Sequence, residues 1–258
     1  MIKENFFPSR AALITVISAC LIVATFMGLR MVFGLFTDFF VKDLQCTITE
    51  FGLAIGIQML MWGMFAPIFG ALADKIGSSK VTIIASLFVA LGIYLLYSGP
   101  NTGIFFQINL GLLIGIGLGG TAISIQIAAV GKHFPNKTRG MAIGIVVAMA
   151  SIGYFFSPIY TKFALSNFGW EKTLNTYLYF VLFGIIAAIF LREVKKEKNI
   201  NGSNKVDNQT LVEALKEAFN HKGFILLTLG FFVCGFNITL VSAHIPMYIQ
   251  ERGFEIWT

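Results

Sequence analysis

Long apolar runs, separated by short polar segments, make up most of this sequence. Each run approaches or exceeds the roughly 20 residues that a helix needs to cross the hydrocarbon core of a bilayer. The pattern therefore predicts an all-α, multispan membrane protein. The seven predicted membrane helices cover Ala11–Phe36, Phe51–Ala73, Val81–Tyr97, Gly103–Val130, Gly140–Lys162, Thr173–Leu191 and Gly223–Ile249.

Charged residues are scarce. They make up 12% of the 258 residues, whereas hydrophobic residues make up 56%. Soluble domains carry about 25% charged residues, so the composition supports the membrane assignment. The three cysteines are scattered and show no metal-ligand spacing. We therefore expect neither a metal site nor a cofactor.

Lys and Arg residues are distributed unequally between the two sides of the predicted membrane. Most of the 19 lie on the amino-terminal side, and the opposite segments contain only Lys42, Lys162, Lys172 and Arg252. In multispan proteins the cytoplasmic loops carry the excess of Lys and Arg. We therefore expect a plasma (inner) membrane protein with a cytoplasmic amino terminus. The net charge of +6 reflects this topology and does not suggest a nucleic-acid partner.

A short polar connection between Gly70 and Lys80 links the second and third predicted helices. A connection of this length makes the two helices antiparallel neighbours. It contains one carboxylate, Asp74, which would be costly a few residues deeper in the bilayer. We therefore expect Asp74 to meet a partner at the membrane edge.

The spacing in this loop resembles the signature of the major facilitator superfamily between its second and third helices, roughly G-x-x-x-D-R/K-x-G-R/K-R/K. Two serines replace the usual basic pair, and the last lysine comes one residue late. The inner loop before the fifth helix is similar to an F-P-x-x-x-R-G turn of one superfamily branch. The resemblance implies a motif that helps to hold one transporter conformation. Its residues here are Gly70, Asp74, Lys75, Gly77, Lys80 and Arg139.

Members of the superfamily have twelve helices in two similar halves. The resemblance therefore implies an N-terminal six-helix bundle over residues 1–191, a cytoplasmic linker with an amphipathic helix over 192–222, and the first helix of the C-terminal bundle over 223–258. We expect the chain to be truncated, so that the missing part of the C-terminal bundle is one of its partners.

Glycines cluster in the fourth predicted helix, where Gly115, Gly117 and Gly120 formally match a dinucleotide-binding fingerprint. That fingerprint needs a preceding strand and an acidic residue about 20 positions later, and neither is evident here. Small residues at helical spacing instead allow neighbouring helices to pack closely. We therefore predict a packing role for these glycines.

Arg30 lies inside the first predicted helix. No acidic residue occurs inside any of the seven predicted helices, so the sequence offers Arg30 no partner within the membrane. A buried guanidinium there favours an anion such as a carboxylate. Alternatively, Arg30 extends to the outer headgroups or to Asp38. Residues 28–34 also resemble a G-x-R-x-x-F-G feature of the monocarboxylate and oxalate/formate branch.

Other polar residues are further candidates for binding the substrate. His244 on the seventh helix, with Pro246 and Gly253 after it, resembles another feature of the same branch. A histidine can bind an anion or pass a proton near neutral pH, or it can be a packing residue. Interhelical hydrogen bonds are the alternative role for the polar residues within the helices. The remaining candidates are Asn237, Thr121, Gln126 and Tyr154.

We expect a secondary active transporter of a small organic anion, a mono- or dicarboxylate, that works by alternating access and is coupled to protons or to exchange. Its partners are then the lipid bilayer, the anion and, where it is coupled to them, protons. The alternative is an efflux antiporter for drugs or other small solutes. Such proteins commonly carry an arginine before the glycines of the fourth helix and a G-P pair on the fifth. This chain has Gly111 and Ser157-Pro158 there.

Two other classes fit the sequence poorly. A seven-helix receptor or retinal protein has the opposite orientation, and a retinal protein needs a lysine that the seventh helix lacks. An intramembrane hydrolase needs paired aspartates or a His-Glu-x-x-His metal site, and the sequence has neither. We therefore expect that the protein is not an enzyme.

Overall fold

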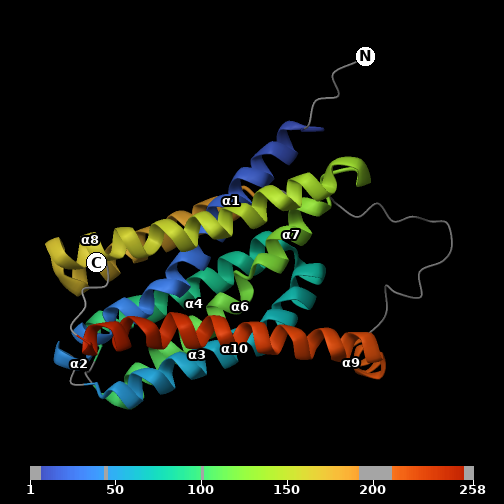
Figure 1. Ribbon diagram of the computed structural model, residues 1–258. Coiled ribbons are helices and arrows are strands. Elements are labelled where there is room, and N and C mark those ends of the chain that lie inside the picture. The colour runs from blue at the N-terminus through green and yellow to red at the C-terminus, as the bar shows by residue number, and fades with distance from the viewer. Residues whose placement is uncertain (1–6, 44–45, 100–101, 192–210, 253–258) are drawn as a thin grey trace. The chain divides into compact units, whose positions relative to one another are not determined.

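The computed structural model describes residues 7–43, 46–99, 102–191 and 211–252, including only part of the side chains of α9 and α10. Its elements are all helical within these ranges (Figure 1). They are α1 (Arg10–Val32), the 3-10 helix η1 (Phe33–Phe36), α2 (Thr37–Asp43), α3 (Ile48–Ile76), α4 (Ser78–Ser98), α5 (Gly103–Phe106), the π-helix η2 (Gln107–Leu113), α6 (Ile114–Gly120), α7 (Ile123–Gly131), α8 (Asn136–Ile189), α9 (Leu211–Asn220) and α10 (Lys222–Glu251).

The chain forms two compact units, residues 1–194 and 195–258. The first unit contains α1 to α8 and a continuous apolar core. The second contains α9 and α10, where the ring of Phe219 packs edge-on against that of Phe224 with the centroids 5.8 Å apart.

Five described segments are long and apolar enough to cross a membrane, and a shorter apolar helix covers Lys222–Ile238. The five overlap the first six predicted helices, because the fifth and sixth both lie within α8. The shorter helix overlaps the seventh. The all-α, multispan fold class is therefore confirmed. The five segments are Arg10–Asp43, Ile48–Ile76, Ser78–Ser98, Gly103–Gly131 and Asn136–Ile189.

α8 is a hairpin of two helices. Gly169 has φ 78° and ψ 171° within it, a conformation that is essentially confined to glycine. The two arms lie side by side, since Thr161 Oγ1 and Tyr177 OH share a hydrogen bond of 2.6 Å between them. Gly169 therefore separates the fifth predicted span from the sixth.

Local capping explains where several helices begin or end. The Ala12 amide donates to Ser9 Oγ at 3.1 Å at the start of α1. Thr47 and Glu50 form a capping box at the start of α3, in which each side chain accepts a hydrogen bond from the other residue's amide. Gly77, with φ 102°, ends α3 and allows α4 to begin at the next residue.

The glycines of the fourth span pack against helices on both sides, as predicted. A Cβ added to Gly115 would lie 2.8 Å from the Gln58 carbonyl oxygen of α3, and one added to Gly117 would lie 2.6 Å from the Ala85 carbonyl oxygen of α4. These distances leave no room for a side chain, so α6 contacts the backbones of both neighbours.

The fourth predicted span, Gly103–Val130, is present within Gly103–Gly131, but its helix is not continuous. The π-helix η2 interrupts its amino-terminal part, and the backbone leaves the helical conformation at Ala122 (φ −55°, ψ 145°). Gly119 and Gly120 precede this break, and glycine is a poor helix former. The Thr121 hydroxyl lies 3.3 Å from the carbonyl oxygens of both Gly117 and Leu118 and can donate to either at the break.

Candidate substrate site

The site begins with a very close crossing of α1 and α8. A Cβ on Gly28 would overlap the Ser157 hydroxyl, and one on Gly153 would overlap the Ala24 carbonyl oxygen. Glycine at both positions allows the two backbones to touch. The crossing places the residue after Gly153, Tyr154, beside the last turn of α1, where Arg30 lies.

The half-buried Arg30 side chain is surrounded by groups from α3 and α8. Its Nη2 donates to Tyr154 OH at 3.0 Å, and its Nη1 donates to Met59 Sδ at 3.6 Å. The guanidinium carbon lies 4.5 Å from the centroid of the Trp62 ring, a cation–π contact. We call Arg30, Met27, Met59, Trp62 and Tyr154 the Arg30 cluster.

The donors of the Arg30 cluster outnumber its acceptors. Arg30 Nε and Trp62 Nε1 are buried without a hydrogen-bond partner among the described residues. Tyr154 OH donates only to Met27 Sδ, at 3.3 Å, and a thioether is a weak acceptor. Unmade hydrogen bonds of buried donors are costly, so the cluster is chemically suited to a ligand that brings oxygen acceptors.

Arg30 forms no ion pair with any carboxylate in the described part of the chain. The alternative in which it reaches Asp38 is therefore not the one this structure adopts. Its guanidinium instead contacts the aromatic rings of Trp62 and Tyr154, the Tyr154 hydroxyl and the Met59 thioether. These groups solvate a cation but do not neutralise it, which leaves a net positive charge at the site.

The structure joins Arg30 to Tyr154, and it places other predicted binding residues elsewhere. Gln126 is fully buried and donates through Nε2 to Thr82 Oγ1 of α4 at 3.0 Å, while Thr121 caps the helix break. Asn237 donates to the Val233 carbonyl of its own helix at 3.0 Å. His244 belongs to α10, but its side chain lies outside the described residues. Substrate contact by these four residues stays a prediction.

Sequence reasoning missed three members of the cluster, Met27, Met59 and Trp62. The available signal was the position of Trp62 near the middle of a span, since membrane tryptophans usually lie at the interfaces. A tryptophan near the middle of a span therefore predicts a partner inside the protein. Here that partner is the Arg30 guanidinium.

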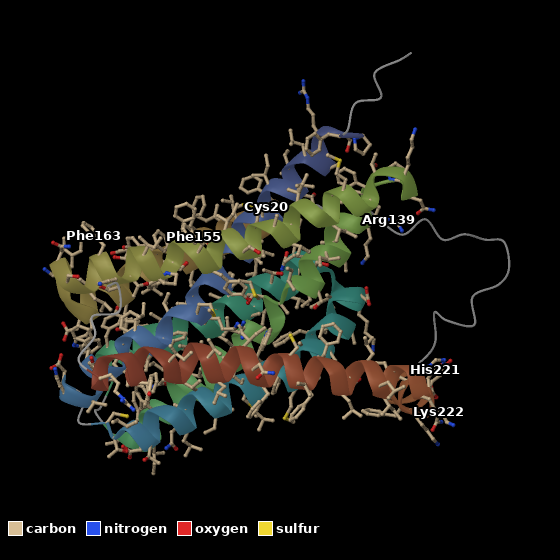
Figure 2. All side chains as sticks on the ribbon, viewed as in Figure 1. Cys20, Arg139, Phe155, Phe163, His221 and Lys222 are labelled. Carbon is tan, nitrogen blue, oxygen red and sulfur yellow. The ribbon has the colours of Figure 1, made fainter. Side chains whose placement is uncertain are left out.

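The connection between α3 and α4 provides a second group of predicted residues. Asp74 meets Lys132 of the α7–α8 connection at 3.4 Å, so the expected partner of Asp74 is present. Ser79, at a position where the signature is basic, donates to the Ala188 carbonyl at 2.6 Å and links α4 to the end of α8. Arg139 Nε donates to the Phe134 carbonyl at 3.4 Å across the turn before α8 (Figure 2).

The remaining motif residues have different surroundings. Lys75 and Lys80 are exposed, and a Cβ added to Gly70 would meet nothing within 4 Å. Gly77 is required by its positive φ of 102°. The motif is therefore anchored within the first unit by Asp74 and Ser79, while its lysines remain free to contact other groups.

An all-α multispan bundle with an arginine inside its first span is an architecture that membrane transporters adopt. The sequence profile described as Major Facilitator Superfamily matches residues 18–258. The chain belongs to this superfamily. Its members are transporters and not enzymes, so the enzyme and receptor classes are set aside.

Curated relatives include transporters of two different solutes. The chain is 24% identical over 159 residues to the probable nitrate transporter NarT of Staphylococcus carnosus, covering 61% of this chain and 39% of that protein. It is 27% identical over 229 residues to the riboflavin transporter RibZ of Clostridioides difficile, covering 83% of this chain and 44% of that protein. The chain thus spans less than half the length of these relatives.

A solved structure shows the same fold. The POT family transporter PepTSo matches with a TM-score of 0.57 and 15% sequence identity, over 90% of this chain and 48% of that one. At this identity the match shows the fold alone. It agrees with the helical bundle described above.

Proposed function

We propose that this chain belongs to a secondary active transporter of small organic anions, mono- or dicarboxylates, that works by alternating access with coupling to protons or to exchange. The substrate binds at the Arg30 cluster. The observation that carries this proposal is the buried Arg30 Nε, which has no acceptor in the described part of the chain. A desolvated guanidinium without a carboxylate partner favours binding of an anion.

Of the two relatives, NarT supports an anion in general more than a carboxylate in particular. The name of NarT assigns it nitrate, which is a planar oxyanion like a carboxylate. The assignment of an organic anion rests on the likeness of residues 28–34 to the monocarboxylate and oxalate/formate branch. Nitrate is therefore included in the test below.

The rival proposal is an antiporter that exports drugs or other small solutes. The aromatic rings of Trp62 and Tyr154 beside Arg30 favour it, because flat solutes stack on such rings. The name of RibZ, which assigns it a flat heterocycle, points the same way. This rival needs the ring faces but not the Arg30 charge, so a charge-removing variant separates the two proposals.

The organisation we propose follows from the superfamily. Residues 1–191 form the N-terminal bundle, 192–222 a cytoplasmic linker, and 223–258 the first helix of a C-terminal bundle that completes the pathway. The amino terminus lies in the cytoplasm and the protein in the plasma (inner) membrane. In this proposal His244 and Asn237 contact the substrate from the helix of residues 223–258, and His244 couples transport to protons.

The test is uptake by the full-length protein in proteoliposomes. Radiolabelled acetate and oxalate, nitrate and riboflavin are offered separately to wild type, Arg30→Gln and the matched control Arg10→Gln, which removes an exposed charge at the start of α1. We expect Arg30→Gln to abolish uptake of the anions and Arg10→Gln to retain it. If Arg30→Gln takes up the anions as well as wild type does, the proposal is rejected. If wild type takes up riboflavin but none of the anions, the rival proposal is supported.

A further inference from the structure

The Arg30 guanidinium has contacts on one face and at two of its nitrogens, but its third nitrogen has no hydrogen-bond acceptor in the described part of the chain. The guanidinium carbon lies over the Trp62 ring, 4.5 Å from the ring centroid, so this ring covers one side of the group. One edge is occupied by Tyr154 OH, 3.0 Å from Nη2, and Nη1 contacts the Met59 sulfur at 3.6 Å. The Nε edge has no acceptor in the described part of the chain. A ligand therefore finds its hydrogen bonds in the guanidinium plane and finds the Trp62 side closed.

The other uncommitted donors surround the same cation. The Trp62 indole N–H is buried without a partner among the described residues, and it belongs to the ring that covers Arg30. The Tyr154 hydroxyl directs its proton to Met27 Sδ at 3.3 Å, an acceptor that an oxyanion readily replaces. A matching ligand thus offers two or more oxygen acceptors on a compact head.

The surroundings of these donors also limit the charge of the head. Apart from Arg30, the cluster consists of two thioethers and two aromatic residues. Stripping water from a strongly hydrated dianion is costly, and one guanidinium with two neutral donors does not compensate for it. The site is therefore matched to a single negative charge.

We propose that Trp62 is a specificity-determining residue, which makes the Arg30 cluster select trigonal planar monoanionic heads (carboxylate or nitrate) and reject tetrahedral anions. This inference rests on the proposed anion transport and names its substrate class. A planar head lies in the guanidinium plane and accepts from Nε, whose buried donor has no acceptor in the described part of the chain, and the Trp62 ring stays in place. A tetrahedral head carries oxygens out of that plane, toward the face that Trp62 covers.

The test is competition against uptake of radiolabelled acetate by the full-length protein in proteoliposomes. The competitors are nitrate and perchlorate, which are both monovalent and weakly hydrated but differ in shape. We expect nitrate to inhibit wild type at concentrations about tenfold or more below those of perchlorate. Radiolabelled nitrate uptake is measured in parallel, so that carboxylate and nitrate are compared directly as sources of the planar head.

Two Trp62 variants separate the ring from its N–H. Trp62→Leu removes the covering ring and should reduce the nitrate–perchlorate ratio to about threefold or less. Trp62→Phe keeps a ring over Arg30 and should keep the nitrate–perchlorate ratio. Without the indole N–H, both anions should bind about fivefold more weakly. The matched control is Phe155→Leu, which changes an exposed ring on α8 (Figure 2) and should leave both values unchanged.

The outcomes distinguish failure of the shape selection by Trp62 from failure of the proposed anion transport. Equal inhibition by nitrate and perchlorate in wild type overturns the shape selection while anion transport stands. A Trp62→Leu protein that transports with the wild-type ratio, or a Trp62→Phe protein that loses the ratio, overturns the role of the ring. If neither acetate nor nitrate is taken up by wild type, the proposed function fails and this inference fails with it.

Discussion

Gly153 of α8 lies against Ala24 of α1 so closely that a Cβ on Gly153 would overlap the Ala24 carbonyl oxygen. This contact determines where Tyr154 stands, because Tyr154 is the next residue on the same helix. Its hydroxyl is thereby held 3.0 Å from Arg30 Nη2. A packing contact between two small residues thus sets the geometry of Arg30, which is the only charged residue in the predicted first helix, Ala11–Phe36.

The crossing can be tested with Gly153→Ala. The added methyl forces α1 and α8 apart, and overpacking of this kind costs about 1–3 kcal/mol. We expect a lower apparent melting temperature of the purified protein in detergent. The matched control is Gly144→Ala on the same helix, where an added Cβ meets nothing within 4 Å. Equal melting temperatures for the two variants would show that the crossing is not tight.

The Tyr154 hydroxyl can be removed with Tyr154→Phe, which keeps the ring. Arg30 Nη2 then loses its acceptor, and the substrate loses a donor. Because one hydrogen bond to a charged group contributes about 1.5–3 kcal/mol, we expect the affinity for the anion to fall by about tenfold or more. Equilibrium binding of radiolabelled acetate measures this. Tyr179→Phe, at an exposed position on α8, is the control, and equal affinities in the two variants would remove Tyr154 from the site.

The ion pair between Asp74 and Lys132 is exposed, with side-chain exposures of 72% and 44%. Exposed pairs contribute less than about 1 kcal/mol, so Asp74→Asn should barely change thermal stability. The superfamily motif predicts that transport falls nevertheless, because Asp74 helps to hold one conformation. Uptake and melting temperature are measured on the same preparation. A variant with full transport would argue against a conformational role, and a large loss of stability would argue for a structural one.

The positive φ of Gly77 gives a further prediction. With φ 102° and ψ 148°, a Gly77→Ala variant would place a Cβ in a conformation that costs about 1–3 kcal/mol. Gly70→Ala, in open space on the same helix, should be neutral. Thermal unfolding in detergent compares the two. A Gly77→Ala protein as stable as Gly70→Ala would mean that α3 and α4 can be joined without the left-handed turn.

The spans were predictable from sequence because crossing a bilayer demands length and apolarity, which are local properties. The same holds for the glycines of α6, whose helical spacing indicated packing, and for Asp74, whose position at a membrane edge required a partner. Each of these depends on residues within one segment or on one strong physical constraint.

The break at Ala122 and the role of Trp62 could not be derived in this way. Whether a glycine-rich helix opens depends on contacts with α3 and α4, and Thr121 stabilises the break only after the backbone has opened. Trp62 became a candidate only when α1 and α3 were placed together, since its partner Arg30 is 32 positions earlier in the chain. Hydropathy carries no information about such pairs.

The central claim is that Arg30 binds an anion through its charge and its planar fork. Its most direct test is equilibrium binding of radiolabelled acetate and oxalate to full-length wild type, Arg30→Lys and Arg30→Gln in detergent. Lysine keeps the charge without the fork, and glutamine keeps hydrogen bonding without the charge. We predict a decrease in affinity of about tenfold for Arg30→Lys and about a hundredfold or more for Arg30→Gln. Wild-type affinity in the Arg30→Gln protein, with the protein correctly folded, would contradict the account.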